Sequence, residues 1–260
     1  MAPMRVLVTG GSGSLGSEVV AELGRRGHEA RPASRRTGVD LSTGAGLAEA
    51  VAGVDAVVHC ATAPQSPRRV DVDGTGRLVS ALARQPVPPH LVHISIVGCD
   101  RSPFPYYRAK TEVEQRLARW DGPVTVVRAT QFHPFAAAVA QLLMVGRTAL
   151  SIGDMAVQPA DIPWVANHLV DIATGLAPQG FSRATDLAGP DVLTMAEVAE
   201  MVRRHAGKSP PRVVRVPPVG GVLRAFSDRV IVPSGDAETG GRSFSAWLDS
   251  QPPRLPSLRR

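Results

Sequence analysis

The chain has few cysteines, few tyrosines and almost no lysine, and it has no long apolar run. Cys60 and Cys99 are too few for a disulfide framework or a metal cluster, and both lie in or beside predicted strands, so we expect reduced core thiols. No stretch approaches the roughly 18 unbroken apolar residues of a membrane span. The first predicted strand begins at Arg5, which leaves no room for a signal peptide. We therefore expect a cytoplasmic protein that has no membrane partner.

The chain also lacks a concentrated basic surface, although its formal net charge is +6. The arginines are scattered, and no basic stripe with interleaved aromatic residues is present. A dispersed basic surface suits an anionic cofactor as well as a polymer, so we expect no nucleic acid partner. With 260 residues the chain can bury a full core, as one α/β enzyme domain or as a domain with a lobe.

What the chain does have is a short apolar strand that leads through glycines into a helix. Residues 5–8 are apolar enough for a buried parallel strand, and Gly10, Gly13 and Gly16 follow at a spacing of three. Backbone N–H groups at the start of such a helix face one point, and the missing Cβ atoms let a pyrophosphate approach closely. This context predicts a dinucleotide site. The alternative is a glycine-rich turn that only packs the helix against the strand.

Strands and helices alternate along the first half of the chain. Pro32 favours an edge position for the second strand, because proline cannot donate to a sheet ladder. The alternation predicts a Rossmann-like α/β fold with a doubly wound parallel sheet, whose ligand lies beyond the carboxyl ends of the strands. The expected strands are 5–8, 28–34, 56–61, 91–96 and 124–128, and the expected helices are 74–84 and 106–119.

Beyond about residue 130 the pattern is less regular. Helices are expected around 135–143 and 163–176, and Thr194-x-x-Glu197 is a capping box that opens a helix. We expect residues 1–150 to form the Rossmann core, and residues 151–260 to form a smaller, partly interleaved substrate-binding region. Trp164 suits an apolar substrate pocket there, although ordinary core is the alternative for each such residue.

A second motif lies at 106–110, where the only two tyrosines of the chain stand beside one of its two lysines. Tyr106 and Lys110 are four apart, so on a helix they share one face. A neighbouring ammonium stabilises a phenolate, which brings a tyrosine hydroxyl within reach of acid–base work near neutrality. The alternative is a surface pair on an amphipathic helix. Beside a nucleotide loop we interpret the pair as catalytic.

Together the glycine loop and Tyr106-x-x-x-Lys110 resemble the short-chain dehydrogenase/reductase superfamily. The glycine spacing is similar to its extended and atypical branches. Leu187-Ala188-Gly189-Pro190 and the closing segment around 241–248 resemble the atypical NAD(P)H-binding, NmrA-like subgroup. The resemblance covers nearly the whole chain, and its motifs indicate the superfamily better than the substrate.

The resemblance implies three catalytic residues. Tyr106 would donate or take the proton at the substrate oxygen, and Lys110 would hold the nicotinamide ribose and bias Tyr106. Ser95 matches the serine that polarises the substrate carbonyl, but it lies closer to Tyr106 than in extended members, and Ser102 is an alternative. Asp71 stands where these members often carry an asparagine.

The resemblance also implies cofactor contacts at the pyrophosphate loop, the adenine, its ribose and the nicotinamide. His133 follows the strand expected beside the nicotinamide, so it would line the substrate pocket with Trp164; incidental placement is the alternative. The expected cofactor-binding residues, including those argued in the next paragraph, are Gly10, Gly13, Ser14, Leu15, Gly16, Ser34, Arg35, Arg36, Asp40, Leu41, Ala61, Thr62, Lys110, Thr130 and Phe132.

The end of the second strand indicates which cofactor binds. NAD-binding folds place a carboxylate there for the ribose 2′-hydroxyl. This chain has Ser34, Arg35 and Arg36 and no acid. A hydroxyl and two guanidiniums suit a 2′-phosphate, so we expect NADP(H) in preference to NAD(H). An exposed basic loop is the alternative.

The function that these features indicate is NADPH-dependent reduction of a carbonyl or related group on a small-molecule substrate. Two alternatives stay open: redox-neutral epimerisation, dehydration or isomerisation on the same fold, and an NmrA-like regulator that senses NAD(P). The complete Tyr106/Lys110 pair argues against the sensor, and the short chain argues against a nucleotide-sugar epimerase. We expect no metal, since the histidines show no ligand spacing. A homodimer is the default assembly, and the arginine and proline content indicates a high-GC bacterial source.

Overall fold

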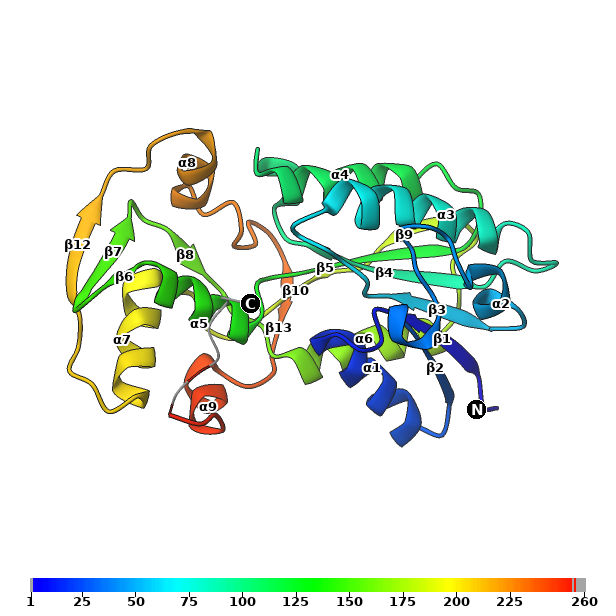
Figure 1. Cartoon of the computed structure of the whole chain (residues 1–260), viewed down its shortest axis with the longest axis horizontal. Coiled ribbons are helices and arrows are strands. Elements are labelled where there is room, and N and C mark those ends of the chain that lie inside the picture. The colour runs from blue at the N-terminus through cyan, green and yellow to red at the C-terminus, as the bar shows by residue number, and fades with distance from the viewer. Residues whose placement is uncertain (1, 254, 256–260) are drawn as a thin grey trace. The chain divides into compact units, whose positions relative to one another are not determined.

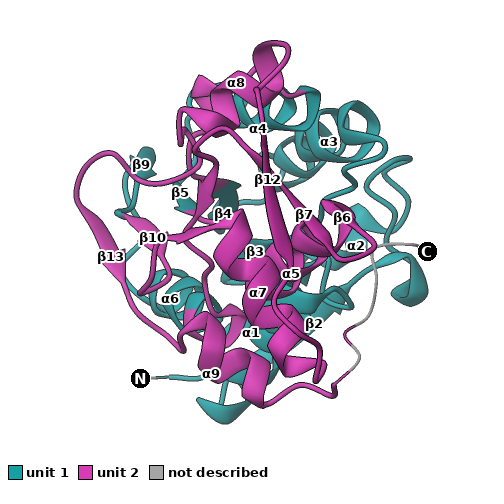
Figure 2. Ribbon diagram, turned by 90° about the vertical axis from the view of Figure 1, so that its left-hand side faces the viewer, with its two compact units in different colours: residues 1–95, 105–128, 165–185 teal, residues 96–104, 129–164, 186–260 magenta. Residues whose placement is uncertain are grey.

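The computed structural model describes residues 2–253 and residue 255 of the chain. These residues form two compact units, which Figure 2 colours separately. Unit 1 contains residues 1–95, 105–128 and 165–185, and unit 2 contains residues 96–104, 129–164 and 186–260. The chain thus alternates between the units several times. The sequence analysis expected a Rossmann core of residues 1–150 and a smaller, partly interleaved region of residues 151–260.

Unit 1 is built on a parallel sheet in the order β9-β5-β4-β3-β1-β2. The central strands β3 and β4 are buried almost throughout, which explains why they read as continuous apolar runs. The strand β2 lies at the edge, as Pro32 predicted. The strands are β1 (Arg5–Thr9), β2 (Glu29–Ala33), β3 (Ala56–His59), β4 (His90–Ile96), β5 (Val124–Ala129) and β9 (Phe181–Arg183).

Helices cover both faces of this sheet, with α3 and α4 on one side and α1 and α6 on the other (Figure 1). Leu78 and Leu82 of α3 and Val113 and Leu117 of α4 are fully buried against the sheet. The helical segments are α1 (Ser14–Arg25), η1 (Arg35–Thr37), α2 (Leu47–Val51), η2 (Arg68–Val72), α3 (Asp73–Leu82), α4 (Pro105–Leu117) and α6 (Ile162–Thr174). The doubly wound, Rossmann-like α/β fold predicted from the sequence is therefore confirmed.

The strand order places a topological switch between β1 and β3. From β1 the chain proceeds to β2 on one side, and the later strands β3, β4 and β5 follow on the other side. In open parallel sheets, ligands bind beyond the carboxyl ends of the strands at such a point. The segments that leave β1 and β3 there are the glycine loop from Gly10 and the turn Cys60-Ala61-Thr62.

Unit 2 contains most of the less regular part of the chain beyond residue 128. The expected capping box is present at the start of α7, where Glu197 N donates to Thr194 Oγ1 and Thr194 N donates to Glu197 Oε2. Its strands are β6 (Met144–Val145), β7 (Thr148–Ile152), β8 (Ala156–Val157), β10 (Asp186–Ala188), β11 (Leu193–Thr194), β12 (Arg212–Val216) and β13 (Ala237–Thr239). Its helices are η3 (Cys99–Arg101), α5 (His133–Leu142), α7 (Met195–His205), α8 (Gly221–Ser227) and α9 (Phe244–Asp249).

None of the helices in residues 2–253 combines the length and the apolar character that crossing a membrane requires.

Candidate active site

The glycine loop that follows β1 has no space for a Cβ at Gly10 or Gly16. Gly10 has a φ of +69°, and a Cβ there would lie 2.7 Å from the backbone nitrogen of Ala61. A Cβ on Gly16 would overlap the carbonyl oxygen of Gly10. The loop therefore needs glycine to bring β1, the turn after β3 and α1 together.

The first turn of α1 offers its backbone N–H groups without competition from side chains. Gly13 is the N-cap residue, so no side chain caps the helix, and the first turn carries no acidic residue. In contrast, Thr194 and Glu197 satisfy the same groups at the start of α7. An uncapped N-terminus with a positive dipole end suits an anion such as a pyrophosphate.

The end of β2 supplies polar groups for a second part of a dinucleotide. The hydroxyl oxygen of Ser34 is shielded from solvent and has no hydrogen-bond partner among the described residues. Arg35 and Arg36 follow in η1 with exposed side chains. Hydrogen bonds from the side chain of Ser42 and from Ser42 N, the latter at 2.8 Å, hold the pKa of the Asp40 carboxyl below its usual value. Leu41 is part of the core.

Tyr106 and Lys110 lie one turn apart near the start of α4. The ammonium nitrogen Nζ of Lys110 is 5.8 Å from the centre of the Tyr106 ring. Tyr106 is partly exposed, whereas Tyr107 is buried in the core at 6 % exposure. Of the two tyrosines, Tyr106 is therefore the one with access to a ligand.

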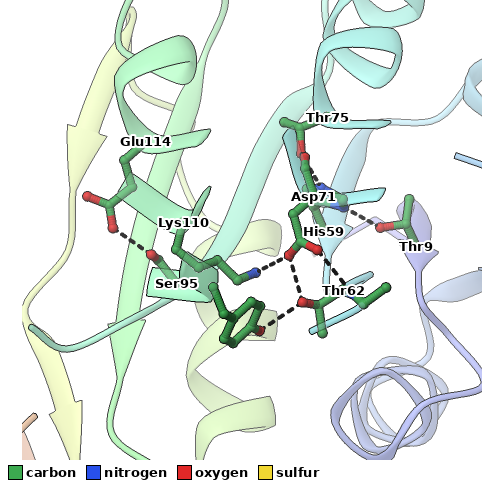
Figure 3. A network of polar contacts seen from close by, with 10 residues as sticks. Thr9, His59, Thr62, Asp71, Thr75, Ser95, Lys110 and Glu114 are labelled. Carbon is green, nitrogen blue, oxygen red and sulfur yellow. Dashed lines mark hydrogen bonds and ion pairs between the residues drawn. The ribbon is translucent and has the colours of Figure 1, made fainter. Parts of the chain in front are cut away.

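A carboxylate that the sequence analysis noted only as a departure completes this group. Asp71 Oδ1 lies 3.1 Å from Lys110 Nζ, and both side chains are buried, at 1 % and 3 % exposure. Asp71 also accepts hydrogen bonds from Thr62 Oγ1 at 2.6 Å and from Ala63 N at 3.0 Å. Figure 3 shows Asp71 between Lys110 and Thr62.

Thr62 connects Asp71 with Tyr106. Its hydroxyl oxygen is 2.8 Å from the Tyr106 hydroxyl. The sequence analysis did not anticipate this contact, since it expected Thr62 among the cofactor-binding residues. Burial lowers the pKa of the Lys110 ammonium, but the charges of Tyr106 and Asp71 outweigh burial, so this pKa is raised above its usual value. Lys110 is therefore a cation at neutral pH, beside the phenol ring.

Neutral side chains surround this ion pair. Burial, together with the charge of Lys110, lowers the pKa of His59 to about 3 and that of His93 well below its usual value. The nitrogens of the His59 ring contact Thr9 Oγ1 at 2.6 Å and Thr75 Oγ1 at 2.9 Å. Burial also raises the pKa of the Cys60 thiol to about 12. The charges of this cluster at neutral pH are thus those of Lys110 and Asp71.

The sequence analysis expected the Ser95 hydroxyl to bind the substrate carbonyl. In the structure this hydroxyl bonds a side chain of the protein. The Ser95 hydroxyl donates to Glu114 Oε1 at 2.5 Å, and both side chains are buried (Figure 3). Glu114 also binds Arg128 through two hydrogen bonds, from Nε at 2.8 Å and from Nη2 at 2.6 Å. Ser95 therefore belongs to a buried ion-pair network. Ser102, the alternative, lies in unit 2, where its oxygen accepts a hydrogen bond from Phe104 N.

The remaining expected site residues belong to unit 2 and have contacts within it. Thr130 Oγ1 donates to the carbonyl oxygen of Gln158 at 2.5 Å, and Phe132 is the N-cap residue of α5. His133 is buried; its Nε2 donates to the Arg242 carbonyl, and its ring stacks on Trp247. Burial lowers the pKa of His133, which suits a neutral ring in this position. Trp164 packs beneath the backbone of residues 240–241.

The sequence analysis did not predict that Thr62 contacts Tyr106 or that Asp71 pairs with Lys110. The signal for Asp71 was its acidic side chain where the resembling family often has asparagine, next to the apolar residues Val70 and Val72. Nothing in the local pattern connects Thr62 with Tyr106, because the two residues are 44 positions apart. Among residues 2–253 and 255, no group of three or more His, Cys, Asp or Glu side chains is arranged to hold a metal ion.

The comparisons with known proteins match this region and this fold. Residues 6–98 match the model of the NAD dependent epimerase/dehydratase family. A 3-beta-hydroxysteroid dehydrogenase of Mycolicibacterium neoaurum is 38 % identical over an aligned part that covers 30 % of this chain and 28 % of that protein. The match to this relative thus spans less than a third of either chain.

Solved structures are similar over most of the chain. The UDP-glucose 4-epimerase of Thermus thermophilus in complex with NAD has a TM-score of 0.66 and 20 % identity, covering 95 % of this chain and 98 % of that one. An NADPH-dependent quinone oxidoreductase of Escherichia coli, complexed with NADPH, has a TM-score of 0.62 and 18 % identity over 87 % and 88 %. The chain therefore has the fold of these nucleotide-dependent enzymes, and its residues 6–98 carry the sequence pattern of the NAD dependent epimerase/dehydratase family.

Proposed function

We propose that this protein is an NADPH-dependent oxidoreductase of the short-chain dehydrogenase/reductase type, which reduces a carbonyl or a related group on a small organic substrate. The observation that carries the proposal is that the Tyr106 hydroxyl contacts Thr62, which bonds Asp71, while the ammonium of Lys110 lies 5.8 Å from the centre of the Tyr106 ring. These residues belong to the same unit as the glycine loop. The match of residues 6–98 to an NAD dependent family supports it. Redox-neutral epimerisation or dehydration is the second candidate, since the matching family model is named for those reactions.

The residues at the carboxyl edge of the sheet fit a dinucleotide. The glycine loop leaves no room for a Cβ, the N-terminus of α1 is uncapped, and the buried oxygen of Ser34 has no partner in the described part of the chain. Gly10, Gly13 and Gly16 would hold the pyrophosphate, and Lys110 would hold the nicotinamide ribose. When bound, the nicotinamide supplies or takes a hydride.

In this proposal Tyr106 moves a proton at the substrate oxygen. Tyr106 is partly exposed, and Lys110 is held in place by its ion pair with Asp71. A fixed cation next to a phenol favours charge that develops on the phenol oxygen during proton transfer. Ser95 is left out of this step, because its proton goes to Glu114.

The substitution Gly16→Ala tests whether cofactor binding needs the close packing of the glycine loop. The added Cβ would overlap the Gly10 carbonyl oxygen, so we expect the loop to shift and NADP(H) to bind roughly tenfold or more weakly, about 1.4 kcal/mol. Fluorescence titration of NADPH measures the affinity. Gly24→Ala is the control in the same helix, where nothing lies within 4 Å; it should keep binding and add about 0.5–1 kcal/mol of stability. Unchanged binding in Gly16→Ala would contradict the role of the loop.

The preference for NADPH depends on Arg35 and Arg36. Replacing both by alanine is expected to weaken NADPH binding by about 1–3 kcal/mol, the scale of lost charged hydrogen bonds, and to leave NADH binding nearly unchanged. Isothermal titration with each cofactor measures both affinities. Arg84→Ala is the control, since Arg84 is exposed after the end of α3. Equal affinity of the unaltered protein for the two cofactors would rule out the preference.

The reaction type is tested by NADPH consumption with a panel of small aldehydes, ketones and quinones. A 3β-hydroxysteroid with NADP⁺ belongs in the panel because of the relative of that name. Turnover of any member supports the oxidoreductase. Tight NADPH binding with an inert panel would favour the regulatory alternative, and conversion of a sugar nucleotide without net cofactor consumption would favour the epimerase alternative.

A further inference from the structure

We propose that Thr62 and Asp71 form a proton relay behind Tyr106, and that this relay runs from the tyrosine towards the carboxylate. The proposal rests on the proposed function in giving Tyr106 the proton transfer to substrate. Thr62 and Asp71 touch neither substrate nor cofactor in it; they act through Tyr106. The three oxygens are joined by contacts of 2.8 Å and 2.6 Å.

The direction of the relay follows from counting protons. Asp71 Oδ1 lies 2.6 Å from Thr62 Oγ1 and 3.1 Å from the Lys110 ammonium, and an ionised carboxylate only accepts hydrogen bonds. Thr62 therefore donates its single proton to Asp71. The Thr62 oxygen can then only accept, so the Tyr106 hydroxyl donates to it.

The other contacts of Asp71 hold it in this role. Its second oxygen, Oδ2, accepts a hydrogen bond from Ala63 N at 3.0 Å, next to Thr62 in the turn after β3. Asp71 belongs to η2, a single π-helical turn that leads into α3 and packs against α4. Such turns occur frequently at functional sites. Asp71 thus links the turn after β3 with Lys110 of α4.

The charges around the relay are balanced. Lys110 and Asp71 compensate each other, while His59, His93 and Cys60 are neutral at neutral pH because of their burial. A protonated tyrosine is compatible with this neutral surrounding.

The direction of the hydrogen bonds in the relay defines which substrate group can bind the resting site without rearrangement. The proton of Tyr106 is used by Thr62, so a lone pair of its oxygen remains for a ligand. That lone pair accepts the proton of a hydroxyl group, which indicates an alcohol as the substrate form that binds the resting enzyme. The site is then ready for the oxidative direction of the proposed reaction.

The step balances along the relay. The substrate O–H bond breaks and its proton joins the Tyr106 oxygen; the Tyr106 proton moves to Thr62, and the Thr62 proton moves to Asp71 Oδ1. The electrons of the substrate C–H bond leave as hydride to NADP⁺, which is the oxidant. Asp71 ends as the neutral acid and returns its proton by the same path, through the partly exposed Tyr106, to water.

The sign of one spectroscopic shift tests this polarity without substrate or cofactor. The chain has two tyrosines, so in a Tyr107→Phe background the phenolate absorbance reports Tyr106 alone. If Thr62 accepts from the neutral phenol, Thr62→Val removes a bond that favours the neutral form. We expect the phenolate absorbance to appear at lower pH by about half to one unit. Thr62→Ser keeps the hydroxyl and should restore the original midpoint.

The opposite result is as clear. If Thr62 donates to Tyr106, Thr62→Val removes a bond that favours the phenolate, and the absorbance appears at higher pH; an unchanged midpoint would also overturn the relay. Thr111→Val is the matched control, because its hydroxyl bonds the Tyr107 carbonyl on the same helix, and it should leave the midpoint unchanged. A shift to lower pH in a protein that is inert towards the substrate panel would support the relay and reject only the proposed function.

Discussion

Replacing Tyr106 by phenylalanine is expected to lower turnover by about 10²–10⁴-fold, the usual range for loss of a general acid or base. NADPH binding should stay intact, because the ring of Tyr106 and the ion pair of Lys110 with Asp71 remain. Steady-state rates with the first substrate found in the panel, together with NADPH titration, separate the two effects.

Tyr107→Phe is the matched control for this result. Tyr107 is adjacent in sequence but buried, and it lies edge-on to the Tyr106 ring at 6.2 Å. Its substitution should cost much less turnover. Full activity in Tyr106→Phe would reject the proton-transfer role and would favour a redox-neutral or lysine-centred mechanism instead.

The second large effect concerns stability and is expected from Glu114→Gln. The carboxylate of Glu114 neutralises Arg128, which is only 5 % exposed, through hydrogen bonds at 2.6 Å and 2.8 Å. Glu114→Gln takes a carboxylate at contact distance away from this buried guanidinium. We expect the free energy of unfolding to fall by about 3–5 kcal/mol. Urea denaturation followed by circular dichroism measures this change.

Glu112→Gln on the same helix is the control. Glu112 pairs with the exposed Arg68 at 3.1 Å, and surface pairs contribute about 0–1 kcal/mol. A similar fall in the free energy of unfolding in Glu114→Gln and Glu112→Gln would show that the buried pair contributes no more to stability than the surface pair. Ser95→Ala should lie between them, since it removes one hydrogen bond to Glu114 and leaves the ion pair in place.

Features that depend on local spacing could be predicted from the sequence. The apolar run before Gly10 and the uncapped helix after Gly13 follow from residues that are neighbours in the chain. Pro32 cannot donate to a ladder, so it indicated the edge strand, and Thr194 with Glu197 marked the start of α7. The alternation of strands and helices then left few topologies other than a doubly wound parallel sheet.

The partners of the site side chains could not be predicted in this way. The spacing of Tyr106 and Lys110 placed them on one face of a helix, but what lies opposite that face depends on the sheet. Parallel crossovers bring the ends of β3 and η2 to α4 from far away in the sequence, as the 44 positions between Thr62 and Tyr106 illustrate. The same packing turned Ser95 towards Glu114, because Arg128 of the adjacent strand β5 requires that carboxylate.

The sequence by itself therefore determined the Rossmann-like architecture and the Tyr106/Lys110 pair, since both follow from short-range patterns of residue size and polarity. Only the tertiary structure decided that Asp71 compensates Lys110 and that Thr62 joins Asp71 to the tyrosine. The physical reason is burial: a cation that is removed from water needs a carboxylate at contact distance, and the folded chain selects which one it is.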